Sequence, residues 1–277
     1  MAQTARTHAE RAAAFKALHT REGIFLIPNP WDVGSARILA ALGFEALATT
    51  SAGHAFSMGQ GDNTLTREAT LAHARDLVDA TDLPLSADLG NCFGDDPDSV
   101  GETIRLAGAT GLAGASVEDA TYRSEQPVYD FALAVERVRA AAEAAHSLAV
   151  PLTLTARAEN LLVGRQDLAD TIRRLQAYQE AGADVLYAPG LLTLEDVRTV
   201  VRSVDRPMNV LAGLAGARFT MRDLAAAGVR RVSTGSALAR AAYGEFLRAT
   251  LEMRDRGTFE FVESAASSKE ITGLLSN

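Results

Sequence analysis

The chain has 277 residues, and 47% of them are hydrophobic, which is enough apolar material for one large α/β domain with its own core. A formal net charge of −8 argues against nucleic acid and against an anionic membrane surface as partners, and the single cysteine, Cys92, excludes an internal disulfide framework. The only lysines, Lys16 and Lys269, lie near the termini, which disfavours a Schiff-base aldolase. We expect a cytoplasmic protein, because the segment from Met1 to Arg11 has no signal-type apolar run and no stretch is apolar enough to span a membrane.

Short β-rich apolar runs alternate with amphipathic helical stretches along the chain, a pattern typical of parallel βα units. The predicted strands are Ile24–Ile27, Ala46–Thr49, Leu85–Leu89, Gly114–Val117, Leu152–Ala156, Val185–Tyr187, Met208–Leu211 and Arg231–Thr234. The predicted helices between them are Ser35–Leu42, Arg67–Thr81, Pro97–Ala107, Asp130–Ala149, Asp167–Ala181, Leu194–Ser203 and Met221–Ala227. Several helices end in glycine just before the next strand, as at Gly43, Gly182 and Gly228.

Eight βα units favour a closed (β/α)₈ TIM barrel over an open doubly wound sheet, although the count alone leaves the sheet possible. Two more helical stretches, Leu238–Arg254 and Phe259–Leu275, follow the eighth strand, and we expect the extra helix to pack on a neighbouring subunit. No Pro- or Ser-rich linker divides the chain. The sequence therefore predicts one domain over residues 1–277, with the barrel proper at about 24–243 and C-terminal helices at about 238–277.

Carboxylates follow neighbouring strands of the predicted barrel. Asp88 lies at the end of the third strand, Glu118 at the end of the fourth, and Asp62 in the Gly-rich loop after the second. In a barrel these positions converge on the C-terminal rim, where three carboxylates repel one another unless a hard cation such as Mg²⁺ neutralises them. Alternatively, Asp88 and Glu118 are helix N-caps or members of rim ion pairs, and Asp62 is a turn residue.

An arginine ends the fifth strand on the side that faces the barrel mouth. Alternation places Thr153, Thr155 and Arg157 on one face of this strand. A guanidinium at that position is suited to a bidentate grip on a carboxylate or phosphonate. Arg157 can also pair with Glu118 or Glu159, and the two roles are compatible.

Other strand ends offer polar groups of lower specificity. Thr50, Ser51 and Ala52 provide small side chains and backbone N–H groups that could cradle an anion, but a structural turn fits the fragment equally well. His54 is the only histidine near a strand end, and a lone histidine is more often packed than catalytic. Asn209 on the seventh strand can reach the mouth or serve as a residue of the barrel interior.

The motifs at the strand ends follow one another along the chain in the same order as in a known protein family. They are Pro28-Asn29-Pro30-Trp31-Asp32, Thr49-Thr50-Ser51-Ala52-Gly53, Ala87-Asp88-Leu89, Val117-Glu118-Asp119 and Thr155-Ala156-Arg157. From about Ile24 to Tyr243 the chain resembles the isocitrate lyase/phosphoenolpyruvate mutase superfamily. The resemblance implies a barrel whose last helix is exchanged between subunits, a tetramer built as a dimer of dimers, and Mg²⁺ binding to 2-keto acids or their 2-hydroxy adducts.

The resemblance also implies roles for individual residues. Asp88 resembles the direct Mg²⁺ ligand, and Asp62 and Glu118 resemble acids that hold metal-bound waters. Arg157 resembles the arginine that binds the substrate anion, and the segment of Thr50, Ser51 and Ala52 resembles the one that holds the keto-acid carboxylate. The shared chemistry makes or breaks a bond next to a pyruvate-like enolate, with Mg²⁺ stabilising the developing oxyanion.

Three features depart from the family pattern. The Asp-x-Asp-x-Gly-Phe-Gly run has Gly90 in place of the second carboxylate and Cys92 in place of its first glycine, and the Lys-x-Cys-Gly-His type of lid is absent from residues 119–127. We therefore expect a weak Mg²⁺ site, which Gly90→Asp or Gly90→Glu tightens provided that the pocket has room for the acid. We also expect poor cleavage of isocitrate and of methylisocitrate, with Cys92 a poor substitute for the lid cysteine.

These observations predict a Mg²⁺-dependent lyase that cleaves a C–C bond in a small 2-keto or 2-hydroxy carboxylate, such as an oxaloacetate-, isocitrate- or methylisocitrate-like acid. Two alternatives remain. One is P–C bond chemistry on phosphonopyruvate. The other is a protein that binds 2-keto acids with only residual activity. The specific substrate depends on the lid and on the mouth residues, so the metal-site motifs alone do not select it.

Overall fold

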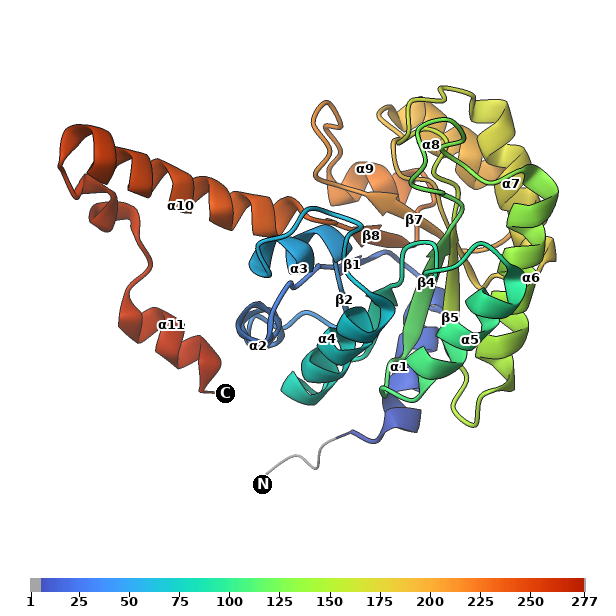
Figure 1. The fold of residues 1–277 in the computed structure, drawn as a ribbon, viewed down its shortest axis with the longest axis horizontal. Coiled ribbons are helices and arrows are strands. Elements are labelled where there is room, and N and C mark those ends of the chain that lie inside the picture. Colours follow the sequence, from blue (N-terminus) through green and yellow to red (C-terminus); the bar gives the residue numbers. More distant parts are fainter. Residues whose placement is uncertain (1–5, 277) are drawn as a thin grey trace.

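Eight parallel strands form a single sheet that curls into a barrel with helices around it (Figure 1). The structure, a computed structural model, describes residues 6–276. The sheet order is β1-β8-β7-β6-β5-β4-β3-β2. The strands are β1 (Phe25–Ile27), β2 (Leu47–Ala48), β3 (Leu85–Asp88), β4 (Gly114–Glu118), β5 (Thr153–Arg157), β6 (Val185–Tyr187), β7 (Met208–Leu211) and β8 (Arg231–Ser233). The predicted (β/α)₈ barrel is confirmed.

The helices follow the strands in the expected alternation. They are α1 (His8–Thr20), α2 (Val33–Ala41), α3 (Ser51–Ser57), α4 (Arg67–Ala80), α5 (Pro97–Gly108), α6 (Phe131–Ser147), α7 (Leu168–Glu180), α8 (Leu194–Arg202), α9 (Met221–Ala226), α10 (Ala237–Arg256) and α11 (Ser268–Leu275), with a 3₁₀ turn η1 (Glu260–Ser264). Most begin at a Thr, Asp or Ser whose side chain accepts a hydrogen bond from a backbone N–H of the first turn. These caps satisfy N–H groups that the helix itself leaves unpaired.

Two helices were not predicted from the sequence. The first, α1, lies before β1 and is fixed at its start by a capping box of Thr7 and Glu10. Its Phe15 is fully buried against Gly114 at the start of β4, where a Cβ would lie 2.6 Å from the Phe15 ring. Only glycine leaves room for this ring, whose burial contributes about 1.5–3 kcal/mol. The second, α3, follows β2 directly and is capped by Thr50.

The barrel closes least completely between β1 and β2, where no ladder of paired residues is found in the described chain. The Ala48 N–H donates to the Pro28 carbonyl at 3.1 Å across this seam. The buried amide of Asn29 reinforces it: Nδ2 donates to the Thr49 carbonyl at 2.9 Å, and Oδ1 accepts from the N–H groups of Thr234 and Gly235. Asn29 of the Pro-Asn-Pro motif thus ties the ends of β1, β2 and β8 together.

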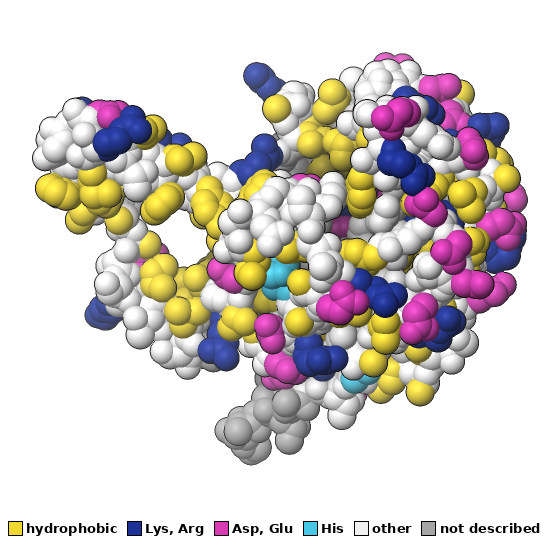
Figure 2. Space-filling view, viewed as in Figure 1, with side chains coloured by type: hydrophobic (Ala, Val, Ile, Leu, Met, Phe, Trp, Pro, Cys, Tyr) yellow, Lys and Arg dark blue, Asp and Glu magenta, His cyan; other side chains and the backbone are white. Residues whose placement is uncertain are grey.

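The C-terminal arm, which we define as α10, η1 and α11, extends away from the barrel (Figure 1). Its end returns to pack against α2. The 20 residues of α10 span about 30 Å, and Ala239 is the residue of this helix that is buried. Exposed apolar side chains lie along the arm (Figure 2); they include Phe246, Leu247, Leu251, Phe259 and Val262.

Among residues 6–276, no helix is both long and apolar enough to cross a membrane.

Candidate active site

A cavity of about 140 Å³ opens at the C-terminal ends of the strands. Of the residues that the sequence singled out, its wall contains Thr50, Ser51, Ala52, Asp62, Asp88, Arg157 and Asn209. Glu118 does not line the cavity, since it lies behind Arg157, 7% exposed. The barrel therefore brings the predicted residues together. Glu118 does not line the cavity and contacts it only through Arg157.

Arg157 stands at the centre of an array of carboxylates. Its Nη1 lies 2.9 Å from Oδ1 of Asp88, its Nη2 2.9 Å from Oε2 of Glu118, and its Nε 2.8 Å from Oε1 of Glu159. The strand register explains the arrangement, because Arg157 at the end of β5 is the direct neighbour of Glu118 at the end of β4 and of Tyr187 in β6. The structure thus contains the ion pairs of Arg157 that the sequence left open.

The array holds more negative than positive charge. Burial raises the pKa of Glu118 well above its usual value, Arg157 opposes this rise, and Glu159 and Asp88 add to it. Burial likewise raises the pKa of Glu159. The pKa of Asp62 is raised by burial of its carboxyl group and then by the charge of Asp88, although the residue as a whole is exposed. Three carboxylates paired with one guanidinium form an environment that a further cation would stabilise.

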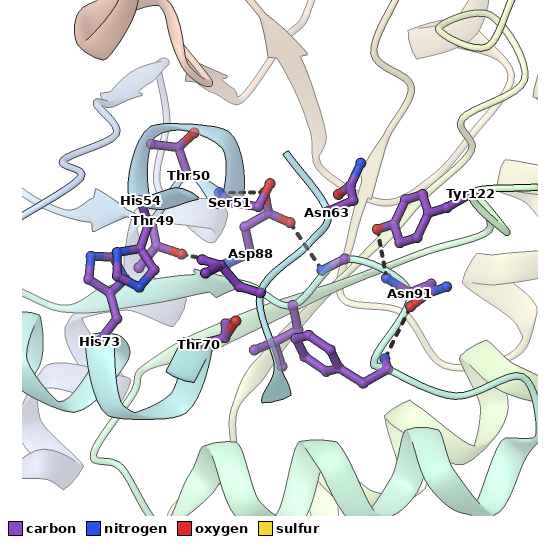
Figure 3. A pocket seen from close by; sticks show the side chains of 14 residues that line it. Thr49, Thr50, Ser51, His54, Asn63, Thr70, His73, Asp88, Asn91 and Tyr122 are labelled. Atoms are coloured by element: carbon purple, nitrogen blue, oxygen red, sulfur yellow. Dashed lines mark hydrogen bonds between the residues drawn. The ribbon is translucent and has the colours of Figure 1, made fainter. Parts of the chain in front are cut away.

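Asp88 is the carboxylate best placed for such a cation. Its Oδ2 accepts a long hydrogen bond, 3.4 Å, from the Ser51 N–H, and its own N–H donates to Oγ1 of Thr49 at 2.8 Å. Figure 3 shows Asp88 between the start of α3 and the loop after β3.

The described residues contain no group of three or more Asp, Glu, His or Cys side chains close enough to hold a metal ion between them. The expected roles of Asp62 and Glu118 as holders of metal-bound waters stay a prediction: Glu118 pairs with Arg157 and accepts from Tyr122, and Asp62 lies on a surface loop. The donor set still fits Mg²⁺, which commonly keeps several waters and takes one or two direct carboxylates. Asp88 would be the direct one.

A second arginine, which the sequence analysis missed, lines the same cavity. One row of paired residues crosses strands β5 to β8, and it consists of Arg157, Tyr187, Asn209 and Arg231. Arg231 is 5% exposed; its Nε donates to Oδ1 of Asn209 at 2.9 Å, and its Nη1 lies 3.4 Å from Nε2 of His19. No described carboxylate forms an ion pair with it, and burial lowers its pKa to about 10. Alternation in β8 was the signal that placed Arg231 inside the barrel.

The position of Gly90 is not vacant. Its φ is +54°, and a Cβ there would lie 2.5 Å from the hydroxyl oxygen of Tyr122. The expected tightening of Mg²⁺ by Gly90→Asp or Gly90→Glu required room for the acid, and the tyrosine fills that space. Nearby, Cys92 and Phe93 both adopt φ of 60° although neither is glycine.

Cys92 is fully buried, and burial raises the pKa of its thiol to about 12. A buried, protonated thiol is a poor acid or nucleophile. Its position supports the expectation that it does not replace a lid cysteine.

His54 lines a second cavity, about 130 Å³, on the other side of Asp88 (Figure 3). Its ring stacks on that of His73 at 3.6 Å with an interplanar angle of 6°. Burial lowers the pKa of both rings, that of His73 to about 4. The stacked, uncharged pair matches the packed role that is more common for a lone histidine.

Asp119, the neighbour of Glu118 in the sequence, lies buried behind the array. Its Oδ1 accepts the N–H of Glu159 at 2.8 Å, and its Oδ2 accepts from Arg174 at 3.0 Å and from Tyr178 at 2.5 Å. This network fixes the backbone that carries Glu159 and therefore the third partner of Arg157.

The fold and this rim define a (β/α)₈ barrel with acids and an arginine at the C-terminal ends of its strands, and comparison with known proteins gives the family. The model of the phosphoenolpyruvate phosphomutase family matches residues 15–254. The chain belongs to this family, and so to the isocitrate lyase/phosphoenolpyruvate mutase superfamily, whose members are enzymes acting on C–C or P–C bonds.

Individual relatives span most of the chain. The structure of a putative lyase/mutase from Burkholderia cenocepacia is 56% identical, with a TM-score of 0.95, and covers 98% of this chain and 97% of its own. A protein of Mycobacterium tuberculosis is 32% identical over 225 residues, 80% of this chain and 82% of its own length. A 2-methylisocitrate lyase of Halalkalibacterium halodurans is 26% identical over 277 residues, 96% of this chain and 90% of its own.

Proposed function

We propose that this protein is a Mg²⁺-dependent lyase that cleaves a C–C bond in a small 2-keto or 2-hydroxy carboxylate. The observation that carries the proposal is the array of Asp88, Arg157 and Glu118 at the rim of a cavity of about 140 Å³. The cavity suits a small acid, and the array combines an oxygen ligand for a hard cation with a guanidinium for an anion.

Each residue of the rim has a role in this proposal. Asp88 would bind Mg²⁺ directly, and Asp62 and Glu118 would hold its waters. When bound, Mg²⁺ would supply stabilisation for the negative charge that develops on the substrate's keto oxygen. Arg157 would bind the substrate's carboxylate. The N–H and hydroxyl groups of Thr50, Ser51 and Ala52 would orient the same carboxylate.

Arg231 favours a substrate with a second acidic group. It is buried without an ion-pair partner among the described residues, and it lines the same cavity as Arg157. Asn209 lies between the two arginines in the strand register and would contact the substrate from the cavity wall. A buried arginine without an ion-pair partner is stabilised when an anionic ligand binds next to it. Because Arg157 would bind one carboxylate, Arg231 favours a substrate with a second one, a di- or tricarboxylate, over pyruvate.

The relatives support this class of chemistry. The 2-methylisocitrate lyase of Halalkalibacterium halodurans covers nearly the whole chain. Structures of an oxaloacetate acetylhydrolase with oxalate and of a phosphonopyruvate hydrolase with oxalate and Mg²⁺ share the fold, with TM-scores of 0.85 and 0.84 at 24% identity.

The exposed apolar arm supports a homo-oligomer. The side chains of α10 and η1 that lie open to water are those expected to pack on a second subunit. We propose a dimer of dimers with exchange of the last helix, and light scattering coupled to size exclusion would measure the mass. Truncation after Tyr243 should then dissociate the assembly.

The function is tested by incubating the protein with Mg²⁺ and a panel of acids, followed by product analysis. The panel contains oxaloacetate, isocitrate, 2-methylisocitrate and phosphonopyruvate, and pyruvate serves as the monocarboxylate control. We expect cleavage of a C–C bond in one of the first three acids, lost when the metal is chelated. Phosphate release from phosphonopyruvate would instead establish P–C chemistry, and binding of every acid without turnover would make the protein a 2-keto-acid binder.

A further inference from the structure

The hydroxyl group of Tyr122 occupies the space that a side chain at residue 90 would need. A Cβ built on Gly90 would lie 2.5 Å from the Tyr122 oxygen, closer than real Cβ contacts. The two residues come from different loops, Gly90 from the one after β3 and Tyr122 from the one after β4. Glycine at 90 and tyrosine at 122 are therefore a matched pair in this chain.

The same hydroxyl ties the two loops together at the edge of the site. It donates to Oε1 of Glu118 at 2.8 Å and accepts from the N–H of Asn91 at 3.1 Å. The other oxygen of Glu118 is 2.9 Å from Arg157. Glu118 is thus held at both oxygens, and Figure 3 shows Tyr122 directed at Asn91 on the side of the loop that leads to Asp88.

The backbone conformation of Tyr122 is unfavourable, and its ring is too exposed for burial to offset that cost. Its φ is 60°, a left-handed value that disfavours residues with a side chain, and the residue is 43% exposed. The loop is anchored on either side, where the Thr121 N–H donates to the Pro127 carbonyl at 3.0 Å and Ala120 bridges to Val128. A strained residue that is exposed and yet makes two hydrogen bonds to the site is a candidate for function.

We propose that Tyr122 is a positioning residue for the rim: its hydroxyl replaces the side chain absent at residue 90 and fixes Glu118, and through Glu118 the guanidinium of Arg157. This role rests on the proposed function, since it presupposes that the rim binds Mg²⁺ and a small carboxylate. A phenol provides the hydrogen bond without a negative charge. The rim therefore keeps its geometry with one charge fewer next to an anionic substrate.

The proposal is tested by calorimetry of Mg²⁺ with oxalate as the probe, on the full-length protein. Tyr122→Phe removes the hydroxyl and keeps the ring, and we expect the affinity for oxalate in saturating Mg²⁺ to fall by about tenfold, the lower end for a residue that positions a ligand-binding group. The melting temperature without ligand should fall only modestly, because the ring stays in place and the loss is confined to the two hydrogen bonds of the hydroxyl group. Tyr243→Phe in α10 is the matched control and should bind as the parent does.

A double-variant cycle tests whether the Tyr122 hydroxyl takes the place of a side chain at residue 90. Gly90→Glu alone should weaken oxalate binding by about tenfold or more, because the new side chain meets Tyr122. In a Tyr122→Gly background the same Gly90→Glu change should improve binding, and Gly90→Ala in that background measures the cost of the left-handed backbone alone. With a substrate in hand, Tyr122→Phe should lower kcat more than it raises KM.

The outcomes separate the two proposals. If the parent binds oxalate with Mg²⁺ and Tyr122→Phe binds it equally well, or if Gly90→Glu has the same effect in both backgrounds, the role of Tyr122 is overturned while the proposed function stands. A parent that binds neither Mg²⁺ nor oxalate would overturn the proposed function, and the role of Tyr122 with it.

Discussion

Removal of the central guanidinium tests the electrostatics of the rim most directly. In Arg157→Met the acids Glu118 and Glu159 remain buried, with side chains 7% and 2% exposed, and lose the cation that pairs with both. Removing one partner of a buried ion pair typically costs 3–5 kcal/mol, so we expect the free energy of unfolding to fall by about 3–5 kcal/mol at pH 8. The surface pair of Arg123 and Asp95 provides the control, and Arg123→Met should cost less than about 1 kcal/mol.

The loss should depend on pH. The pKa values of Glu118 and Glu159 are already raised above 4.5 by burial, and Arg157 holds them down, so its removal raises them further. A carboxyl whose folded pKa is raised adds stability below its unfolded pKa, and this stability is lost as the pH rises through the folded pKa. The deficit of Arg157→Met should therefore be smallest near pH 5 and grow toward pH 8.

Urea unfolding of both variants and the parent at pH 5, 6.5 and 8 measures this dependence. An equal loss at all three values, or a loss no larger than that of Arg123→Met, would refute the view that buried acids depend on this arginine. Millimolar Mg²⁺ should recover part of the stability at pH 8 if a cation can enter the rim.

Three further predictions concern the metal site, the substrate and the core. Asp88→Ala should abolish Mg²⁺ binding while the fold is kept, and parental Mg²⁺ affinity in calorimetry would remove Asp88 as the ligand. Turnover of isocitrate should stay below about 10 per second, because the lid has no cysteine and Cys92 is buried; faster steady-state cleavage would require another acid. Gly114→Ala should destabilise the barrel by about 1–3 kcal/mol, since the new methyl group meets Phe15, and an unchanged urea midpoint would contradict that packing.

Much of the fold could be predicted from the sequence, because each strand is a short apolar run and most helices begin at a recognisable cap. The helix α3 was not predicted, because the small residues that follow Thr50 fit a turn equally well. The helix α1 was missed because its hydrophobic pattern is weak and the eight βα units appear complete without it.

The site was predicted in its residues but not in its contacts. Alternation and strand ends were enough to choose Asp88, Arg157 and Asn209. The pairing of Glu118 with Arg157 follows from the register of β4 and β5, which neither strand shows alone, and the contact of Arg157 with Asp88 also depends on how β3 lies in the sheet. Gly90 and Tyr122 are 32 positions apart in two different loops. Hydrophobic periodicity predicts helices and strands, and it does not predict contacts between loops.

The seam between β1 and β2 also bears on how the barrel moves. Elsewhere neighbouring strands are joined by ladders of paired residues, whereas here the amide of Asn29 provides much of the connection. Local opening in a protein begins where the least free energy is needed, and a seam held by a side chain separates more easily than a ladder. Amide hydrogens of Ala48 and Thr234 should therefore exchange with solvent sooner than those at the centre of β4 and β5. Because Thr50 and Ser51 follow β2 directly, that motion would give the segment next to Asp88 freedom to adjust around an entering acid, while the strands bearing Glu118 and Arg157 stay in register.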